Sequence, residues 1–337
     1  MRITGYFNIF SNPNNPVVMV KKIFLTGASG FIGRAVVKRL KDNYQLTLLL
    51  PPGEPAVGLS DQNIVRGDIT RPKSLSGLID GHDTVIHMAG AVGHQSWKNC
   101  LSINVDGTRN VIRKAVKAGV IRFIHMSSVS VYGRVPDIMI TEDQPFKKIR
   151  DPYGDTKIDA ELMIRKYAEK NRIDLTVLRP TAVYGDGDSK FLPKLVENLK
   201  TGKFRMMGDG SHSVDLVNVV DVAEAVYLTL LRPESMGHTY NIANQKNPVW
   251  NSLLKNICAE LDIPYSKRHI SYKLAYRVAG LMEFLSIFSN KPPRLSRYAV
   301  RLVGRQYNYS IQKARKELGF EPSIDLIDGI KESMRNI

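Results

Sequence analysis

Cysteine is nearly absent from this chain of 337 residues, which carries only Cys100 and Cys258. Two isolated thiols argue against a disulfide framework and suit a reducing compartment, so we expect a cytoplasmic protein. No Cys/His finger spacing occurs, and we expect no metal site. No uninterrupted apolar run reaches the roughly 18–20 residues needed to cross a bilayer.

Acidic residues are also scarce, because 32 Asp and Glu stand against 48 Lys and Arg and leave a net charge of +16. This excess indicates either a generally basic soluble protein or an anionic partner: a phosphorylated cofactor, an acidic lipid surface or nucleic acid. No Lys/Arg block is dense enough to favour nucleic acid, so we expect none as a partner. The length allows one large domain or two modest ones.

Residues 1–18 differ in character from the rest of the chain. The cluster SNPNNP at Ser11–Pro16 is typical of a turn or a loose segment. A second methionine, Met19, stands directly before VKKIFLTG. We interpret residues 1–18 as a loose N-terminal extension, or Met19 as the place where translation begins.

The stretch KKIFLTGASGFIGR at Lys21–Arg34 organises the first half of the chain. Ile23–Thr26 predicts a buried strand, and the spacing of apolar residues over Phe31–Asn43 predicts a helix. A glycine turn between a strand and a helix lets the backbone approach a pyrophosphate, which the helix N-terminus attracts. The three glycines of this turn are Gly27, Gly30 and Gly33.

The next predicted strand, Gln45–Leu50, bears on the choice of cofactor. In NAD sites an acidic residue usually ends this strand and binds the ribose hydroxyls. Here Pro51–Gly53 follow, and the first acid is Glu54. Arg34 is either a ligand for a 2′-phosphate or a solvated helix residue. The pattern favours NADP over NAD.

Further strands are predicted at Asn63–Gly67, Thr84–Met88 and Ile121–Met126, with one helix over Trp97–Ala118. Strands that alternate with helices predict an α/β protein with a doubly wound parallel sheet. Small residues from Ala89 onward leave room for a ligand at the carboxyl end of their strand.

Tyr153 and Lys157 lie four residues apart in Asp151–Asn171, which predicts a helix with both side chains on one face. A lysine ammonium one turn away favours the phenolate and so lowers the tyrosine pKa from about 10. A serine from SSVSVYG, Ser127–Gly133, supplies a hydroxyl to hold a substrate oxygen. Such a pair occurs by chance in many helices. Together with the glycine turn, however, it indicates general acid/base chemistry.

From Lys21 to about Met334 the chain resembles the extended short-chain dehydrogenases/reductases. The resemblance implies a Rossmann domain over residues 19–180, with returning segments around 208–243, and a smaller, interleaved, mainly substrate-binding part over 181–337. The matching motifs are TGASGFIG (26–33), GDI (67–69), HMAG (87–90), NVDGTRNV (104–111), SSVSVYG (127–133), YGDTK (153–157) and LRPTAVYG (178–185).

The resemblance also implies residue roles. Tyr153 is the expected general acid/base, and Lys157 is expected to bind the nicotinamide ribose and lower the tyrosine pKa. Ser128, a better match than Ser127, is expected to orient the substrate oxygen, and Asn104 matches the position that often completes the tetrad. The residues expected to contact the cofactor are Gly27, Ser29, Gly30, Phe31, Ile32, Gly33, Arg34, Asp68, Ile69, Ala89, Tyr153 and Lys157, with Asp68 and Ile69 flanking the adenine.

Two departures from the family pattern bear on the substrate. Val214 stands where members that act on nucleotide sugars commonly carry an arginine, and Thr181 stands where they often carry asparagine. The C-terminal third most resembles the 3β-hydroxysteroid dehydrogenase branch, which includes sterol 4-carboxylate 3-dehydrogenases and reductases of long-chain 2-alkyl-3-oxo acids. We therefore predict an oxidoreductase for a secondary alcohol or ketone on a hydrophobic small molecule. The alternatives are a nucleotide-sugar epimerase or dehydratase, and a non-catalytic dinucleotide-binding module.

The segment Tyr272–Phe288 carries an apolar stripe at helical spacing. The stripe favours a helix packed on the protein's own core. The alternatives are an apolar lid over the substrate and peripheral membrane contact through residues 272–305. The resemblance further implies a homodimer formed by helices packed face to face. The stripe comprises Leu274, Val278, Leu281, Met282 and Leu285, and the basic residues around it are Lys267, Arg268, Lys291, Arg294, Arg297, Arg301 and Arg305.

Overall fold

A parallel sheet of seven strands forms the centre of the molecule in the computed structural model, which describes residues 22–93, 95–133, 138–245, 247–266, 268–289, 293 and 295–335. The strand order is β11-β7-β5-β4-β1-β2-β3, and every pairing is parallel. Residues 1–18 and Met19 lie outside the described residues. The strands are β1 (Lys22–Thr26), β2 (Gln45–Leu50), β3 (Asn63–Arg66), β4 (Thr84–His87), β5 (Arg122–Met126), β7 (Asp174–Pro180) and β11 (Thr239–Ile242).

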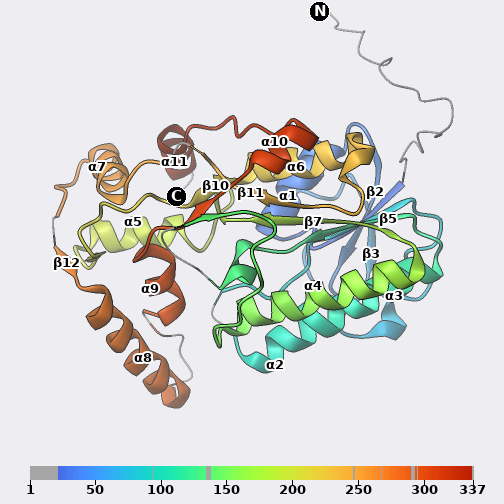
Figure 1. Ribbon diagram of the computed structural model, residues 1–337, viewed down its shortest axis with the longest axis horizontal. Coiled ribbons are helices and arrows are strands. Elements are labelled where there is room, and N and C mark those ends of the chain that lie inside the picture. Colours follow the sequence, from blue (N-terminus) through green and yellow to red (C-terminus); the bar gives the residue numbers. More distant parts are fainter. Residues whose placement is uncertain are drawn as a thin grey trace, which may run out of the picture.

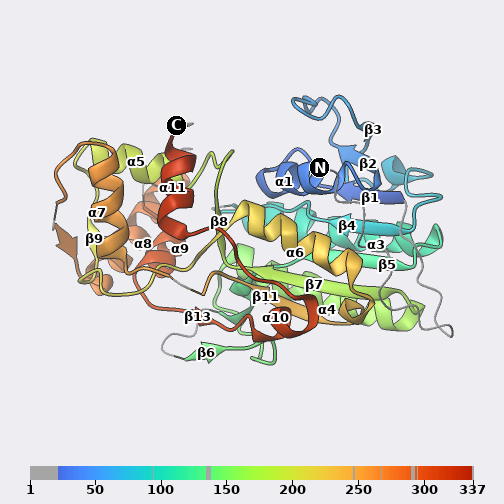
Figure 2. The same cartoon turned by 90° about the horizontal axis from the view of Figure 1, so that it is seen from above.

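Helices cover both faces of this sheet (Figures 1 and 2). On one face lie α1 (Phe31–Leu40) and α6 (Val219–Leu231), and on the other lie α3 (Thr108–Lys117) and α4 (Pro152–Asn171). Because side chains alternate along a strand, Leu25 packs in the core that holds α1 and α6, whereas Phe24 packs in the core that holds α3 and α4. The predicted doubly wound α/β fold is confirmed. The strand order reverses between β1 and β4, where such sheets bind ligands at the carboxyl ends of the strands.

A smaller group of helices lies beyond the carboxyl edge of the sheet (Figure 1). Its core joins α5 (Leu192–Lys200), α7 (Trp250–Glu260) and α11 (Leu326–Met334). The chain then returns, because α10 (Gln312–Leu318) packs beside β11. The remaining strands form parallel pairs: β8 (Ala182–Tyr184) with β10 (Leu216–Asn218), β9 (Met206–Met207) with β12 (His269–Ile270), and β6 (Met139–Ile140) with β13 (Asn308–Tyr309).

The helix predicted over Trp97–Ala118 is confirmed over Trp97–Lys117, and it consists of three successive segments without a break between them. They are α2 (Trp97–Cys100), a π-helical segment η2 (Leu101–Gly107) and α3. A π turn takes in an extra residue per turn, which shifts the register of every later side chain on the helix. In η2 the wider turn carries Asn104, whose buried side chain hydrogen-bonds the backbone of Ala91. Short 3-10 turns complete the fold: η1 (Pro72–Leu75), η3 (Val129–Tyr132) and η4 (Pro233–Ser235).

The core-packing interpretation of the apolar stripe is wrong. On α8 (Tyr272–Ser289), the buried residues are Ala275 and Ala279, whereas Leu281 and Leu285 are 59% and 54% exposed. The helix packs against α9 (Arg297–Val303) through its small residues, which leaves the bulky stripe outside. Lys267, Lys291 and Arg294 of the expected basic cluster lie outside the described residues. Within the described part of the chain, no helix combines the length and apolarity needed to cross a bilayer.

Candidate active site

The glycine turn between β1 and α1 is shaped by two close backbone approaches. At Gly27, φ is +80°, and a Cβ atom there would lie 2.6 Å from the backbone N of Ala89. At Gly33, a Cβ atom would lie 2.0 Å from the carbonyl oxygen of Gly27. Both positions therefore require glycine. The approaches bring the carboxyl ends of β1 and β4 against the first turn of α1.

The N-terminus of α1 suits a pyrophosphate. Its N-cap residue is Gly30, which has no side chain to cap the helix, and the first turn holds no acidic residue. The N–H groups of this turn are therefore open to an anionic ligand. Ser29, Phe31 and Ile32 flank this end of the helix and are half-buried. The residues at the turn thus fit the dinucleotide predicted from the sequence.

Two arginines hold the loop that follows β2. Arg34 donates hydrogen bonds from Nε to the carbonyl oxygen of Ser29, at 3.0 Å, and from Nη1 to that of Val57. Arg66 donates from Nη1 to the carbonyl oxygen of Pro51, at 3.1 Å. Arg34 lies in the first turn of α1, and Arg66 is the last residue of β3. Sequence reasoning identified Arg34 and missed Arg66.

Asp68 and Ile69 lie at the carboxyl end of β3. The Oδ1 atom of Asp68 accepts hydrogen bonds from the backbone N and the hydroxyl of Thr70, at 2.8 and 2.7 Å. Ile69 is buried, and a Cβ atom at Gly107 would lie 2.7 Å from its Cδ1 atom. The carbonyl oxygen of Ile69 accepts a hydrogen bond from Asn110 at 2.9 Å. These contacts fix the wall of the crevice next to the glycine turn.

Asn104 ties the loop after β4 to α4. Its Oδ1 atom accepts a hydrogen bond from the N–H of Ala91 at 2.8 Å. Its Nδ2 atom donates to the carbonyl oxygen of Ala91 at 3.2 Å and to the hydroxyl of Thr156 at 3.1 Å. A Cβ atom at Gly90 would lie 3.4 Å from Nζ of Lys157. These hydrogen bonds join the loop after β4 to the helix that carries Tyr153 and Lys157.

The start of α4 is capped in a way that fixes the turn carrying Tyr153. Asp151 is the N-cap residue and accepts a hydrogen bond from the N–H of Gly154 at 3.0 Å. Pro152 occupies the first turn, where its missing N–H is not needed. Asp155 accepts hydrogen bonds from the backbone of the preceding loop. Tyr153 is half-buried in this turn.

Lys157 lies one turn further along α4 and is 4% exposed. Its Nζ atom donates a hydrogen bond to the carbonyl oxygen of Met126, the last residue of β5, at 2.9 Å. Burial lowers the pKa of Lys157 to about 8, although Glu161 and Cys100 act in the opposite direction. The ammonium group of the lysine is thus held at the carboxyl end of β5 by a hydrogen bond to one backbone oxygen.

Ser128 follows closely after this strand end. It is 9% exposed and forms the N-cap of η3, where its Oγ atom accepts a hydrogen bond from the N–H of Ser130 at 3.2 Å. The carboxyl end of β5 therefore brings Ser128 and the anchor of Lys157 to one place. Sequence reasoning missed Glu161, buried one turn after Lys157. The available signal was the repeat of four that runs through Tyr153, Lys157 and Glu161.

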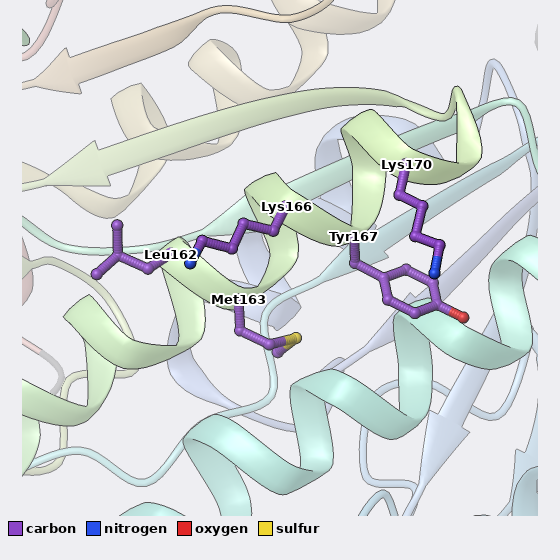
Figure 3. A pocket seen from close by; sticks show the side chains of 5 residues that line it. All are labelled: Leu162, Met163, Lys166, Tyr167 and Lys170. Carbon is purple, nitrogen blue, oxygen red and sulfur yellow. The ribbon is translucent and has the colours of Figure 1, made fainter.

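A shallow depression of about 410 Å³ lies on another side of α4 (Figure 3). Leu162 in its wall is exposed, whereas Lys157 and Glu161 on the same helix are buried. The depression therefore lies on a different face of α4 from Lys157 and Glu161. It is lined by Leu162, Met163, Lys166, Tyr167 and Lys170.

Comparisons with known proteins agree with this geometry. Residues 23–243 match the family described as the NAD dependent epimerase/dehydratase family. The chain belongs to this family. Among its relatives, the 2-alkyl-3-oxoalkanoate reductase of Stenotrophomonas maltophilia is 28% identical over 92% of this chain and 97% of its own length. The decarboxylating sterol-4-alpha-carboxylate 3-dehydrogenase of Mus musculus is also 28% identical, over 96% of this chain and 92% of its own.

Solved structures of the epimerase/dehydratase family share the fold. The UDP-glucuronic acid 4-epimerase of Bacillus cereus, in complex with NAD, gives a TM-score of 0.74 at 21% identity and covers 94% of this chain and 99% of its own. A short-chain dehydrogenase/reductase superfamily protein of Agrobacterium tumefaciens with bound NAD gives 0.74 at 22% identity, covering 93% and 96%. The chain is an extended short-chain oxidoreductase that uses a dinucleotide of the NAD(P) type and acts on a small molecule.

Proposed function

We propose that this chain interconverts a secondary alcohol and a ketone on a hydrophobic substrate, with Tyr153 as general acid/base and NADP as cofactor. The observation that carries the proposal is the buried anchor of Lys157 on the carbonyl oxygen of Met126, one helical turn from Tyr153 and next to the segment of Ser128. This arrangement joins a proton donor, a buried cation and a hydroxyl at one strand end.

The chemistry of the site follows from these three side chains. In the reductive direction, the Tyr153 phenol donates its proton to the substrate carbonyl oxygen, and in the oxidative direction the phenolate removes the hydroxyl proton. The positive charge of Lys157 favours the phenolate. Ser128 Oγ accepts a hydrogen bond from Ser130 and keeps its own proton to donate to the substrate oxygen. The bound nicotinamide supplies or accepts the hydride.

The glycine turn and its neighbours would hold the cofactor. The N–H groups of the first turn of α1, after the N-cap residue Gly30, suit the pyrophosphate, and Asp68 with Ile69 suits the adenine side of the crevice. Lys157 would bind the nicotinamide ribose from its buried position. Asn104 would keep the loop after β4 in place through its bonds to Ala91.

Two arginines and no carboxylate directly after β2 support NADP over NAD. Arg34 and Arg66 hold the loop that begins at Pro51, and guanidinium groups match the geometry of a phosphate. A carboxylate at the end of β2, the usual partner of the ribose hydroxyls in NAD sites, would repel a 2′-phosphate. The residue at that place is Pro51.

A hydrophobic substrate is supported by the relatives and by one buried residue. The relatives are named for sterol 4-carboxylates and 2-alkyl-3-oxoalkanoates. The position before Asp215 holds Val214, which is fully buried and has no charge for a sugar diphosphate. We assign residues 19–180, with returning segments around 208–243, to cofactor binding and residues 181–337 mainly to substrate binding. The presence of β11 in the central sheet supports the return.

We also propose that α8 rests on an anionic membrane surface. Lys273 and Arg277 are exposed beside the apolar stripe, which offers cationic partners for lipid headgroups. A contiguous apolar face that is exposed to water marks a surface that binds a partner or a membrane. The exposed apolar residues are Leu274, Leu281, Phe284, Leu285 and Phe288.

A homodimer formed through the outer face of α4 remains part of the proposal. The apolar side chains of Leu162, Met163 and Tyr167 share one depression there (Figure 3), and a twofold contact between two copies would cover them. Light scattering of the purified protein should give the mass of two chains. The mass of one chain at micromolar concentration would contradict a stable dimer.

An assay with candidate substrates tests the proposed reaction. Purified protein is mixed with NADPH and a 2-alkyl-3-oxo acid, or with NADP and a 3-hydroxysterol 4-carboxylate, and the absorbance of the reduced nicotinamide is followed. Net consumption or formation of NADPH supports the proposal. Isomerisation of a nucleotide sugar with tightly retained cofactor and no net change would replace it with the epimerase alternative.

A further inference from the structure

A buried ion pair between Glu161 and Arg179 contacts the segment Ser127–Gly133, which carries Ser128. The carboxylate of Glu161 is fully buried, and its Oε1 atom accepts hydrogen bonds from Arg165 at 2.6 Å and Arg179 at 2.5 Å. Its Oε2 atom accepts a bond from the hydroxyl of Ser127 at 2.8 Å and a second bond from Arg179 at 3.2 Å. Both oxygens are therefore occupied, as a carboxylate without access to water requires.

Arg179 extends this contact to the far end of the same segment. Its Nη1 atom donates a hydrogen bond to the hydroxyl of Tyr132 at 2.6 Å, and Tyr132 in turn donates to Asn241 at 2.6 Å. Tyr132 is the last residue of η3. The pair of Glu161 and Arg179 therefore fixes a residue before Ser128 and a residue after it.

Glu161 also lies one turn from Lys157 on the buried side of α4. Besides Tyr153 on the same helix, the titratable groups that interact with the charge of Lys157 come from four elements: Glu161 on α4, Cys100 on α2, His87 on β4 and His125 on β5. Burial keeps both histidines neutral by lowering their pKa values, and burial raises the pKa of the Cys100 thiol. Glu161 is therefore the group of this set that carries negative charge at neutral pH.

We propose that Glu161 is a positioning residue for catalysis, which supplies the negative charge that stabilises protonated Lys157 and, through Ser127 and Arg179, fixes the Ser128 hydroxyl relative to Tyr153. The inference rests on the proposed roles of Ser128, Tyr153 and Lys157. It adds a second tie between α4 and the carboxyl end of β5, since Lys157 holds Met126 and Glu161 holds the next residue.

A role in stability alone predicts a different outcome. A buried ion pair can often be replaced by uncharged residues with little loss of stability, whereas removal of one partner leaves a costly buried charge. The effect of the Glu161 charge on catalysis can therefore be separated from its effect on stability. The single variant Glu161→Gln leaves Arg179 and Arg165 without their counter-charge, and the double variant Glu161→Gln with Arg179→Gln removes both members of the closest pair.

The pH profile of kcat is the readout that a purely structural role would not move. In both variants the negative charge near Lys157 is lost, so Lys157 releases its proton at lower pH. We expect the alkaline limb of the oxidative kcat profile to move down by about one pH unit or more. The double variant should recover thermal stability relative to the single one and keep the moved limb. A stable double variant with the wild-type profile would overturn the electrostatic part.

Ser127→Ala tests the positioning part without changing any charge, so it guards against failure of the other variants to fold. It removes the bond to Oε2 of Glu161. We expect kcat to fall by about tenfold with an unchanged KM for the cofactor, because misplacement of a catalytic group mainly affects turnover. An unchanged kcat would overturn this part.

The matched control is Glu169→Gln, which removes an exposed negative charge from the same helix. Its profile should equal that of the wild type, and a shifted profile would mean that any charge on α4 has this effect, which contradicts a specific role of Glu161. The variant Tyr153→Phe distinguishes a failure of the proposed function from a failure of the inference about Glu161. If that variant keeps its activity, the proposed function fails. If it is inactive and the Glu161 variants keep the wild-type profile, only this inference fails.

Discussion

The Nζ atom of Lys157 donates a hydrogen bond of 2.9 Å to the backbone oxygen of Met126. This contact joins the first half of α4 to the carboxyl end of β5, where the segment with Ser128 begins. An ammonium group held by a backbone oxygen in a buried place cannot move away from Tyr153, one turn before it. The packing of one helix on one strand therefore ties Lys157 to the strand end that Ser128 follows.

Replacement of Arg34 should change the cofactor preference. In Arg34→Ala, the guanidinium that lies between Ser29 and Val57 is lost, so a 2′-phosphate loses a charged partner. We expect the KM for NADP to rise by about tenfold or more, as for loss of one charge-assisted bond, and the KM for NAD to change little. Steady-state kinetics with both cofactors measures the ratio.

Lys38→Ala is the control for this prediction. Lys38 is an exposed cation on the same helix, one turn beyond Arg34, so its removal changes the net charge equally. The ratio of the two KM values should stay as in the wild type. An unchanged ratio in Arg34→Ala would contradict a direct contact with the 2′-phosphate.

Introduction of negative charge on the exposed stripe of α8 should abolish membrane binding. Leu281 and Phe284 are 59% and 56% exposed, so Leu281→Asp with Phe284→Asp should leave the fold intact and remove apolar insertion. Co-sedimentation with vesicles that contain anionic lipid should fall at least about tenfold. Leu231→Asp, at an exposed apolar site on α6, is the control and should bind as the wild type does. Absence of wild-type binding would refute the membrane proposal.

Buried histidine should make the protein lose stability in acid. The ring of His87 bonds the hydroxyls of Thr26 and Thr108, at 2.7 and 2.9 Å. Burial, with a smaller effect of Lys157, lowers its pKa to about 3. The unfolded histidine titrates near 6.5, so between about 6.5 and 3 the unfolded state binds the extra proton. Stability from this group is complete above pH 6.5 and is lost as the pH falls toward 3.

The variant His87→Asn retains a donor and an acceptor but does not titrate. Between pH 6 and 4, we expect its unfolding free energy to fall less steeply than that of the wild type, by about 1.4 kcal/mol per pH unit. Denaturant unfolding at several pH values gives both slopes. Equal slopes would show that His87 takes up no proton on unfolding in this range.

Much of this fold could be predicted because parallel strands that are buried on both faces appear in the sequence as short apolar runs. Ile23–Thr26 is an apolar run because both faces of β1 are covered, and the glycines after it are required by backbone approaches that no other residue allows. Tyr153 and Lys157 could be paired because a helix brings residues four apart together. These signals are local, and local geometry is what periodicity reports.

Other features depend on contacts between distant segments. The π turn carries Asn104, which hydrogen-bonds Ala91 and Thr156 in other parts of the fold. No pattern within Trp97–Ala118 itself indicates that geometry. Arg179 meets Glu161 across two elements, so no spacing reveals the pair. The apolar stripe of α8 would have the same sequence pattern whether it packed on a core or was exposed. Amphipathic spacing predicts an apolar face and not what covers that face.

The kinetics of Tyr153→Phe test the central claim most directly. The substitution keeps the ring and removes the proton that the account assigns to catalysis. We expect kcat to fall by about 100-fold to 10,000-fold, the range for loss of a general acid/base, while the Kd for NADP stays within about twofold. Tyr167→Phe, on the outer side of the same helix, should keep full turnover. Near wild-type kcat in Tyr153→Phe would contradict the account.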